Sequence, residues 1–363
     1  MENKIKVAIV FGGRSTEHEI SLLSAQNVFK ALDKEKYEAV LIGIDKNGQW
    51  HYNEKSMSLL NAEDAETISL SENNHPILLS QNTDQCSLIS LSTKEVITKI
   101  DVIFPVLHGT YGEDGSIQGF AKIANIPCVG CGILGSAIGM DKDIMKRILR
   151  DSGIPVAKWV TIKNDHTQAN YNLIEAELGN QLFIKPANLG SSVGVSFTTN
   201  ESEFFEALKK GLQYDSKVIV EEKIVGREIE CAVLGNEYPK ASIAGEVVPK
   251  NNFYSYESKY LDESGAELHI PADLTALQLK AVQELSLETY SLLECAGMTR
   301  VDMFLKDDDS LLINEINTIP GFTNISMYPK LWENSGVPQQ ELISSLIELA
   351  IDAQVKQNKL LLK

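Results

Sequence analysis

The chain has 363 residues with an ordinary mixture of apolar and charged side chains, typical of a globular protein of two or three domains. Its formal net charge of −17 argues against a nucleic-acid partner, because phosphate binding needs a basic face. No apolar run approaches the length that spans a membrane, so no membrane association is expected.

The N-terminal stretch predicts a strand, a glycine turn and a helix. Residues 6–13 (KVAIVFGG) predict the strand and its Gly-Gly turn, and residues 37–50 (YEAVLIGIDKNGQW) a second strand that ends at a turn. The GxGxxG spacing is absent, so no dinucleotide-binding site is expected. The N-terminus also lacks the cleavage site of a signal peptide, so a cytoplasmic protein is expected. The five cysteines are then expected to be reduced thiols, and the CxxC at 128–131 to serve the core or a turn.

A third strand and helix are expected at residues 102–109 and 113–125, after a polar segment with little pattern. Alternating strands and helices predict a mostly parallel sheet, whose ligands gather at the carboxyl ends of its strands. Glu17 and His108 lie just beyond such ends. A structural and a functional role remain open for both on this evidence.

A boundary is expected near residues 130–142, followed by a helix that Gly153 ends. The apolar strand at 181–186 then runs into a loop rich in glycine and serine. Such a loop can cradle phosphate oxygens with its backbone N–H groups, or it can be a plain surface turn. Lys185 favours the first reading, since a lysine on an apolar strand is unfavourable unless it meets an anion.

Two further strands flank residues 222–226, with Glu221 ending the first and Glu228 opening the second. The segment from about 250 to 272 has no clear period, which is typical of a functional loop such as a lid. Helices are expected from about 273 to 296 and over 334–354.

Residues 300–317 (RVDMFLKDDDSLLINEIN) predict a hairpin. A four-residue loop at 307–310 gives a register in which Met303 opposite Asn314 is the one poor match. The other expected pairs are Lys306 with Leu311, Leu305 with Leu312, Phe304 with Ile313, Asp302 with Glu315, Val301 with Ile316, and Arg300 with Asn317.

This register places the carboxylates of Asp302 and Glu315 side by side, which destabilises a hairpin unless something compensates. A solvated strand face is one explanation. A divalent cation is the other, because two carboxylates and the amide oxygen of Asn317 are hard ligands that suit Mg²⁺. Arg300 would add a fixed positive charge beside them.

Eight stretches, in order along nearly the whole chain, resemble the D-alanine–D-alanine ligases of the ATP-grasp superfamily. They are FGGRSTEHEISL, PVLHGTYGEDGSIQG, MDK, IKPANLGSSVGVS, VEEKIVGREIE, SKYLD, RVDMF and NEINTIPGFT. The resemblance implies an α/β protein, α+β in its C-terminal half, with a three-domain ATP-grasp fold and an N-terminal parallel-sheet domain. The implied domains are an N-terminal α/β substrate-binding domain (1–134), a central ATP-grasp domain (135–220) and a C-terminal ATP-grasp and catalytic domain (221–363).

The resemblance also implies how ATP and metal are held between the last two domains. Two Mg²⁺ ions, for which Mn²⁺ can substitute, would bind Asp302, Glu315 and Asn317. At position 222 the chain has glutamate where some relatives have lysine, but this position mainly uses its backbone. The implied nucleotide contacts are Lys142, Lys185 and Lys259 at the phosphates, Ser191 in the loop beside them, Glu221 and Glu222 at the adenine edge, and Glu228 at the ribose.

The implied reaction joins two D-alanine molecules through an acyl phosphate, releasing ADP and phosphate, for peptidoglycan precursors. A D-alanine–D-lactate or D-alanine–D-serine ligase, and a non-catalytic nucleotide-binding regulator, are the alternatives. A homodimer is expected by resemblance alone. The implied substrate contacts are Glu17 and His108 for the first D-alanine, Ser326 and Met327 for the second, Arg300 and the Gly321 N–H for the oxyanion, and Ser191 and Tyr260 joined to Glu17 under the lid.

Overall fold

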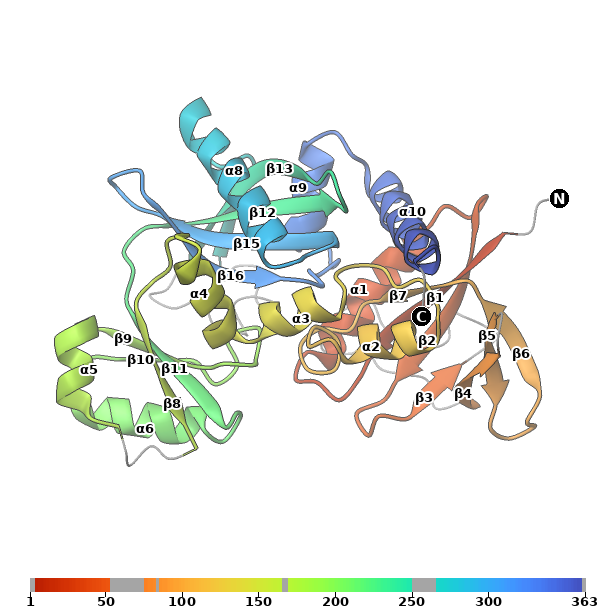
Figure 1. Cartoon of the computed structure of the whole chain (residues 1–363), viewed down its shortest axis with the longest axis horizontal. Helices are drawn as coiled ribbons and strands as arrows, with labels where there is room; N and C mark the ends of the chain where they lie inside the picture. The colour runs from red at the N-terminus through yellow and green to blue at the C-terminus, as the bar shows by residue number, and fades with distance from the viewer. Residues whose placement is uncertain (1–3, 53–74, 83–84, 165–168, 250–265, 361–363) are drawn as a thin grey trace.

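A computed structural model describes residues 4–52, 75–82, 85–164, 169–249 and 266–360, and places three sheets around a common centre (Figure 1). The seven-stranded N-terminal sheet has the order β6-β5-β4-β3-β2-β1-β7. Its strands β1 (Ile5–Gly12), β2 (Tyr37–Ile44) and β7 (Val102–Pro105) are parallel, as predicted. Helices α1 (His18–Ala31) and α2 (Ser116–Ile123) connect to this parallel part.

The weakly patterned segment before residue 100 contributes an antiparallel extension to the same sheet. Its strands are β3 (Trp50–Tyr52), β4 (His75–Asn82), β5 (Gln85–Ser90) and β6 (Val96–Ile100). The N-terminal sheet is therefore mixed, and its carboxyl edge near the site is the parallel part.

The central sheet has four antiparallel strands in the order β10-β9-β11-β8. Its strands are β8 (Trp159–Lys163), β9 (Leu182–Pro186), β10 (Ser196–Thr198) and β11 (Lys217–Glu222). Helices α5 (Tyr171–Leu178) and α6 (Glu201–Gly211) pack against it through a core that includes Phe204 and Leu208. Asn170 and Asn200 cap these two helices with side-chain bonds to their first turns, which fixes where each begins.

The third sheet has five antiparallel strands in the order β14-β13-β12-β15-β16. They are β12 (Arg227–Gly235), β13 (Lys240–Pro249), β14 (Ala266–His269), β15 (Gly297–Leu305) and β16 (Leu311–Asn317). Helix α8 (Ala276–Leu292) begins at a capping box formed by Thr275 and Gln278 and packs on this sheet.

The hairpin of β15 and β16 corrects the predicted register near its turn. Asp302 lies opposite Glu315 and Arg300 opposite Asn317, as expected, but Met303 pairs with Ile313 rather than Asn314. A β-bulge leaves Asn314 unpaired, so the expected pairs of Phe304 with Ile313, Leu305 with Leu312 and Lys306 with Leu311 are wrong. The pairs formed are Phe304 with Leu312 and Leu305 with Leu311. The bulge buries Ile313 in place of a polar asparagine.

Helices α3 (Ile133–Met140) and α4 (Lys142–Asp151) connect the N-terminal sheet to the central one. The apolar side of α4, including Met145 and Leu149, packs in the core of the five-stranded sheet. Its polar side faces the central sheet, where Asp143 accepts hydrogen bonds from Trp159 (3.0 Å) and Thr161 (2.7 Å) of β8. Helix α4 is therefore attached to both ATP-grasp sheets.

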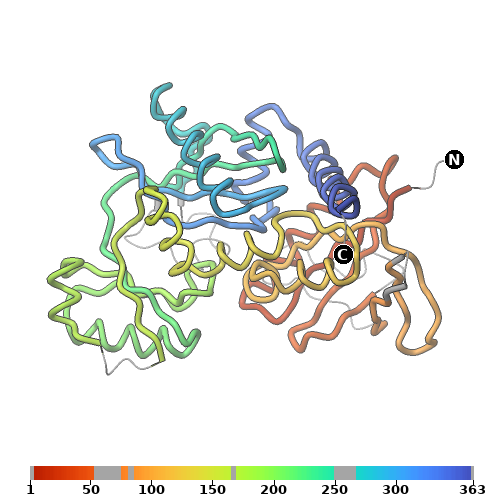
Figure 2. Tube along the Cα trace, viewed as in Figure 1, coloured from red at the N-terminus to blue at the C-terminus, as the bar shows by residue number. Residues whose placement is uncertain are grey.

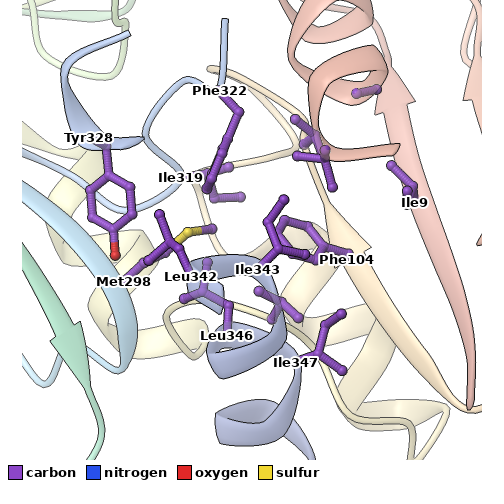
Figure 3. Packing of buried hydrophobic residues seen from close by; sticks show 14 of the residues in the cluster. Ile9, Phe104, Met298, Ile319, Phe322, Tyr328, Leu342, Ile343, Leu346 and Ile347 are labelled. Carbon is purple, nitrogen blue, oxygen red and sulfur yellow. The ribbon is translucent and has the colours of Figure 1, made fainter. Parts of the chain in front are cut away.

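The chain ends by returning to the N-terminal sheet (Figure 2). After α9 (Met327–Asn334), helix α10 (Gln339–Asn358) lays Leu342, Ile343 and Leu346 into one core with Phe104 of β7 and Met298 of β15 (Figure 3). This core fixes the segment 319–328, which leads from β16 to α9, between the first and third sheets. Among the described helices, none is both long and apolar enough to cross a bilayer.

Candidate active site

Two adjoining cavities lie where the three sheets meet. The first, of about 110 Å³, is bounded by the N-terminal sheet, the loop after β9 and the five-stranded sheet. The second, of about 200 Å³, lies between the central and five-stranded sheets. They share Gly190, Glu228, Phe304, Asn314 and Glu315, so they form one continuous cleft.

All the predicted site residues that the structure describes line this cleft. Glu17, His108 and Ser191 enter the first cavity from the N-terminal sheet and the glycine-rich loop. Gly321, Ser326 and Met327 enter it from the segment after β16, and Arg300, Asp302 and Asn317 from the hairpin. Lys142, Lys185, Glu221 and Glu222 line the second cavity, while Glu228 and Glu315 face both. Lys259 and Tyr260 lie outside the described residues.

A row of three carboxylates crosses the floor of the cleft on adjacent strands. Glu230 of β12 lies opposite Asp302 of β15, which lies opposite Glu315 of β16. The Arg300 guanidinium binds both oxygens of Asp302, each at 2.7 Å, and its Nε is 2.8 Å from Glu230. The Asn317 amide donates to Asp302 at 2.9 Å. The Arg300 guanidinium thus offsets the repulsion between the Asp302 and Glu315 carboxylates that the hairpin register predicts.

Glu315 has a weaker partner than Asp302. Its carboxylate is 3.5 Å from the ammonium of Lys142, which also donates to the Leu189 carbonyl at 2.7 Å. Glu230 was missed by sequence reasoning, although it alternates with Glu228 on β12 and so shares its face.

The Mg²⁺ ligands expected from sequence provide the right donor chemistry but not a complete site. Within the described residues, no group of three or more His, Cys, Asp or Glu side chains is gathered closely enough to hold a metal ion. Asp302, Glu315 and Asn317 instead offer few oxygen donors in the first cavity, at the side where Glu315 also faces the second. Such a sparse set fits Mg²⁺, which keeps water and phosphate oxygens among its ligands.

The anion that Lys185 contacts is the carboxylate of Glu221, a residue of the protein itself. Its ammonium is 2.6 Å from one oxygen of the buried Glu221 carboxylate, and the ammonium of Lys146 is 2.8 Å from the other. Burial by itself raises the pKa of Glu221, but the two lysines more than compensate and hold this pKa at about 2. Lys146 was missed because its place on an amphipathic helix resembles that of any exposed lysine.

Glu17 sits in a tight backbone cage at the carboxyl end of β1. Its carboxylate accepts a hydrogen bond from the Ser191 hydroxyl. A Cβ at Gly109 would come within 2.7 Å of one Glu17 oxygen, and one at Gly190 within 3.2 Å of the same oxygen. Gly109 also has a φ of +72°, which favours glycine, so both glycines allow the backbone to approach the carboxylate closely.

His108 holds the first and third sheets together at this point. Its Nδ1 lies 3.1 Å from the Ile319 carbonyl, to which it donates, and its Nε2 accepts from the Ser24 hydroxyl at 3.0 Å. Burial lowers the pKa of His108 to about 4, and the nearby charge of Arg300 adds to the effect. The imidazole is therefore neutral and positions the loop that carries Gly321; its predicted contact with substrate remains a prediction.

Glu113 is a second link to the same loop, and sequence reasoning missed it as a separate residue. Its carboxylate accepts from the Gly109 N–H at 2.8 Å and the Ile319 N–H at 3.2 Å. Burial raises the pKa of Glu113 above its usual value, and the charge of Glu17 raises it further. The carboxylates of Glu17, Glu228 and Glu230 that line the first cavity make it acidic, which suits a cationic ligand group.

Ser326 caps a small turn at the start of α9. Its hydroxyl oxygen accepts from the Thr323 N–H at 2.9 Å, and its own N–H donates to the Thr323 carbonyl at 3.0 Å. A Cβ at Gly321 would come within 2.7 Å of the same hydroxyl oxygen, so a larger residue there would displace the Ser326 side chain. Ser326 and Met327, at the start of α9, line the first cavity, where a helix N-terminus suits a carboxylate.

Comparison with known proteins covers both halves of the chain. The sequence profile described as "D-ala D-ala ligase N-terminus" matches residues 6–131, and the one described as "D-ala D-ala ligase C-terminus" matches residues 148–348. A D-alanine–D-alanine ligase from Oceanobacillus iheyensis is 52% identical over 358 residues, which cover 98% of each chain.

Solved structures of similar proteins agree over nearly the full length. The D-alanine–D-alanine ligase from Coxiella burnetii has a TM-score of 0.85 at 39% identity, covering 98% of this chain and 96% of that one. The VanG D-Ala:D-Ser ligase from Enterococcus faecalis has a TM-score of 0.84 at 38% identity (96% and 100%). A Bacillus anthracis D-alanine–D-alanine ligase complexed with ATP has 0.74 at 28% identity (98% and 100%).

Proposed function

The chain belongs to the D-alanine–D-alanine ligase family, and we propose that it joins two D-alanine molecules in the cleft described above, with ATP as the energy source. The observation that carries the proposal is the pairing of a lysine-lined cavity with an acidic cavity that holds Arg300. Phosphates suit the first, and an amino acid with a reacting carboxylate suits the second. The dipeptide serves cell-wall synthesis as a peptidoglycan precursor.

ATP occupies the cavity between the central and five-stranded sheets in this proposal. Lys142 and Lys185 bind its phosphates, because ammonium groups form strong charge-assisted bonds with phosphate oxygens. Glu221 and the backbone at Glu222 contact the adenine edge, and Glu228 contacts the ribose. The glycine-rich loop through Ser191 closes over the phosphates with its backbone N–H groups.

The first D-alanine binds in the acidic cavity. Glu17 pairs with its ammonium, and the Ser191 hydroxyl holds Glu17 in place. Its carboxylate is phosphorylated by ATP, which supplies the leaving group that a free carboxylate lacks. Phosphoryl transfer needs positioning and charge neutralisation rather than a covalent nucleophile, and Lys142 and Lys185 provide both.

The second D-alanine attacks with its free amine, and phosphate leaves. Ser326 and the Met327 N–H bind its carboxylate at the start of α9. Arg300, which Asp302 and Glu230 hold in place, and the Gly321 N–H stabilise the oxyanion of the tetrahedral intermediate.

Asp302, Glu315 and Asn317 would hold Mg²⁺, or Mn²⁺ as a substitute, in this proposal. The bound cation would supply positive charge to offset that of the phosphates. We further propose that Lys259 and Tyr260 complete the site from the lid, that the chain forms a cytoplasmic homodimer, and that the domain limits are 1–134, 135–220 and 221–363.

ADP release with D-alanine, L-alanine, D-serine, D-lactate or no amino acid tests the function directly. We expect release that requires D-alanine, and a product that chromatography identifies as D-alanyl-D-alanine even in mixtures with D-serine or D-lactate. A mixed product that dominates in an equimolar mixture would reassign the chain to a sister ligase. Nucleotide binding without release under any condition would instead support a regulator.

A further inference from the structure

Lys146 is the least exposed charged residue of the nucleotide side of the cleft, and no step of the reaction uses it. It lies on α4 with 0% of its surface exposed, although the next lysine toward the N-terminus, Lys142, faces the cavity. Lys146 does not line either cavity among the described residues. Lys146 is thus buried behind the cavity wall, and its contact toward the cavity is Glu221.

The position of the Lys146 ammonium is fixed from two sides. Helix α4 is pinned to β8 by the bonds of Asp143 to Trp159 and Thr161, and the Lys146 ammonium lies 5.9 Å from the centre of the Trp159 ring. On the other side lies the Glu221 carboxylate at 2.8 Å. The cation–π contact and the carboxylate both favour a charged lysine at this buried place.

Glu221 is bound by two lysines, of which only one can leave. Lys185 lines the second cavity and keeps 17% of its side chain exposed, so it can turn to an entering phosphate. If Lys146 were absent, that movement would strand a buried carboxylate without a counterion, which is strongly unfavourable. With Lys146 present, Glu221 keeps a counterion while Lys185 moves from the carboxylate to the phosphate.

We propose that Lys146 is a positioning residue that keeps Glu221 neutralised and so releases Lys185 to bind the phosphates of ATP. This inference rests on the proposed binding of ATP in the second cavity. It predicts that the two lysines on Glu221 have unequal roles: one is a permanent counterion and the other is exchanged between carboxylate and phosphate.

The test is Lys146→Met, which keeps the apolar length of the side chain and removes its charge. We expect the Kd and KM for ATP to rise about ten- to a hundredfold, since Lys185 is now held by Glu221, while the KM for D-alanine changes less than about threefold. Arg150→Met is the matched control, because Arg150 lies on the same helix and 5.2 Å from the same Trp159 ring but is exposed. It should leave ATP binding unchanged.

A double-substitution cycle separates positioning from simple support of the fold. In the Glu221→Gln background the buried carboxylate is gone, so Lys146→Met should change the Kd for ATP less than about threefold. The doubly substituted protein replaces a buried ion pair by neutral groups of similar shape, so it should fold even if Lys146→Met alone does not. Calorimetric titration with ATP, after circular dichroism confirms folding, provides the four affinities.

Two results overturn the inference. One is an unchanged ATP affinity in folded Lys146→Met, and the other is an equal loss in the Glu221 and the Glu221→Gln backgrounds. Lys185→Met distinguishes failure of the inference about Lys146 from failure of the proposed function. If Lys185→Met weakens ATP binding while Lys146→Met does not, only the role of Lys146 is wrong. If neither affects ATP, the nucleotide site itself is wrong.

Discussion

Asp302→Asn should destabilise the protein even though it removes a charge from a row of three carboxylates. In the structure Asp302 accepts two hydrogen bonds of 2.7 Å from the Arg300 guanidinium, and it is only 9% exposed. Hydrogen bonds to charged groups contribute about 1.5–3 kcal/mol each. Arg300 retains Glu230 at 2.8 Å in the variant, and asparagine still accepts one bond, so the net loss should be about 1–3 kcal/mol.

Glu315→Gln provides the comparison, because it removes the neighbouring charge of the same row. Glu315 has a longer ion pair, 3.5 Å to Lys142, and 21% of its side chain is exposed. Such a pair contributes at most about 1 kcal/mol. Differential scanning fluorimetry without nucleotide should therefore show a midpoint lower by several degrees for Asp302→Asn, and almost no shift for Glu315→Gln.

Both substitutions should nearly abolish ADP release at ordinary Mg²⁺ concentrations. An assay of ADP release on the same preparations measures this loss. Glu237→Gln is the control, since Glu237 pairs with Lys356 on the surface with 62% of its side chain exposed. It should change neither stability nor activity. A midpoint for Asp302→Asn at or above that of the parent protein would refute the reasoning, because repulsion between the carboxylates would then outweigh the Arg300 fork.

Lys185→Ala should raise the KM for ATP about ten- to a hundredfold and that for D-alanine far less, because a charge-assisted phosphate contact is lost; calorimetry with an unchanged ATP affinity would contradict this. His108 is neutral in the fold, with its pKa lowered from 6.5 to about 4, so the unfolded chain takes up a proton first as pH falls. Its contribution to stability is complete above pH 6.5 and falls by about 3 kcal/mol on reaching pH 4, and urea unfolding should show a shallower pH dependence for His108→Gln. Gly109→Ala puts a Cβ 2.7 Å from a Glu17 oxygen at a φ of +72°, so both the melting midpoint and the affinity for the first D-alanine should fall; steady-state kinetics with an unchanged KM would show that Glu17 does not bind the ammonium.

The sequence by itself determined the local features of this protein. The alternation of apolar residues places Asp302 and Glu315 on one face of a hairpin, because side chains alternate across a strand with a period of two. The parallel β1, β2 and β7 follow from buried strands interrupted by turns and helices. The ordered motifs then indicated the family and many of the charged and polar residues that line the cleft.

Only the tertiary structure decided which side chain meets which partner from a distant part of the chain. Periodicity reports the face on which a residue lies but not what packs against that face. The bulge at Asn314 shows this limit within one hairpin, since burial of Ile313 in a core built with α4 and α8 overrides the simplest register. His108 bonded to Ile319, 211 residues away, shows it across the whole chain.

Two lysines show that the sequence also fails to predict which charged side chains are buried. Lys142 and Lys146 are four residues apart on one helix, and sequence treats both as polar positions. One faces a cavity and the other is fully buried, because α4 is enclosed between two sheets that come from different parts of the chain. Burial is a property of that enclosure, and it makes the ion pair of Lys146 with Glu221 obligatory where an exposed lysine would need no partner.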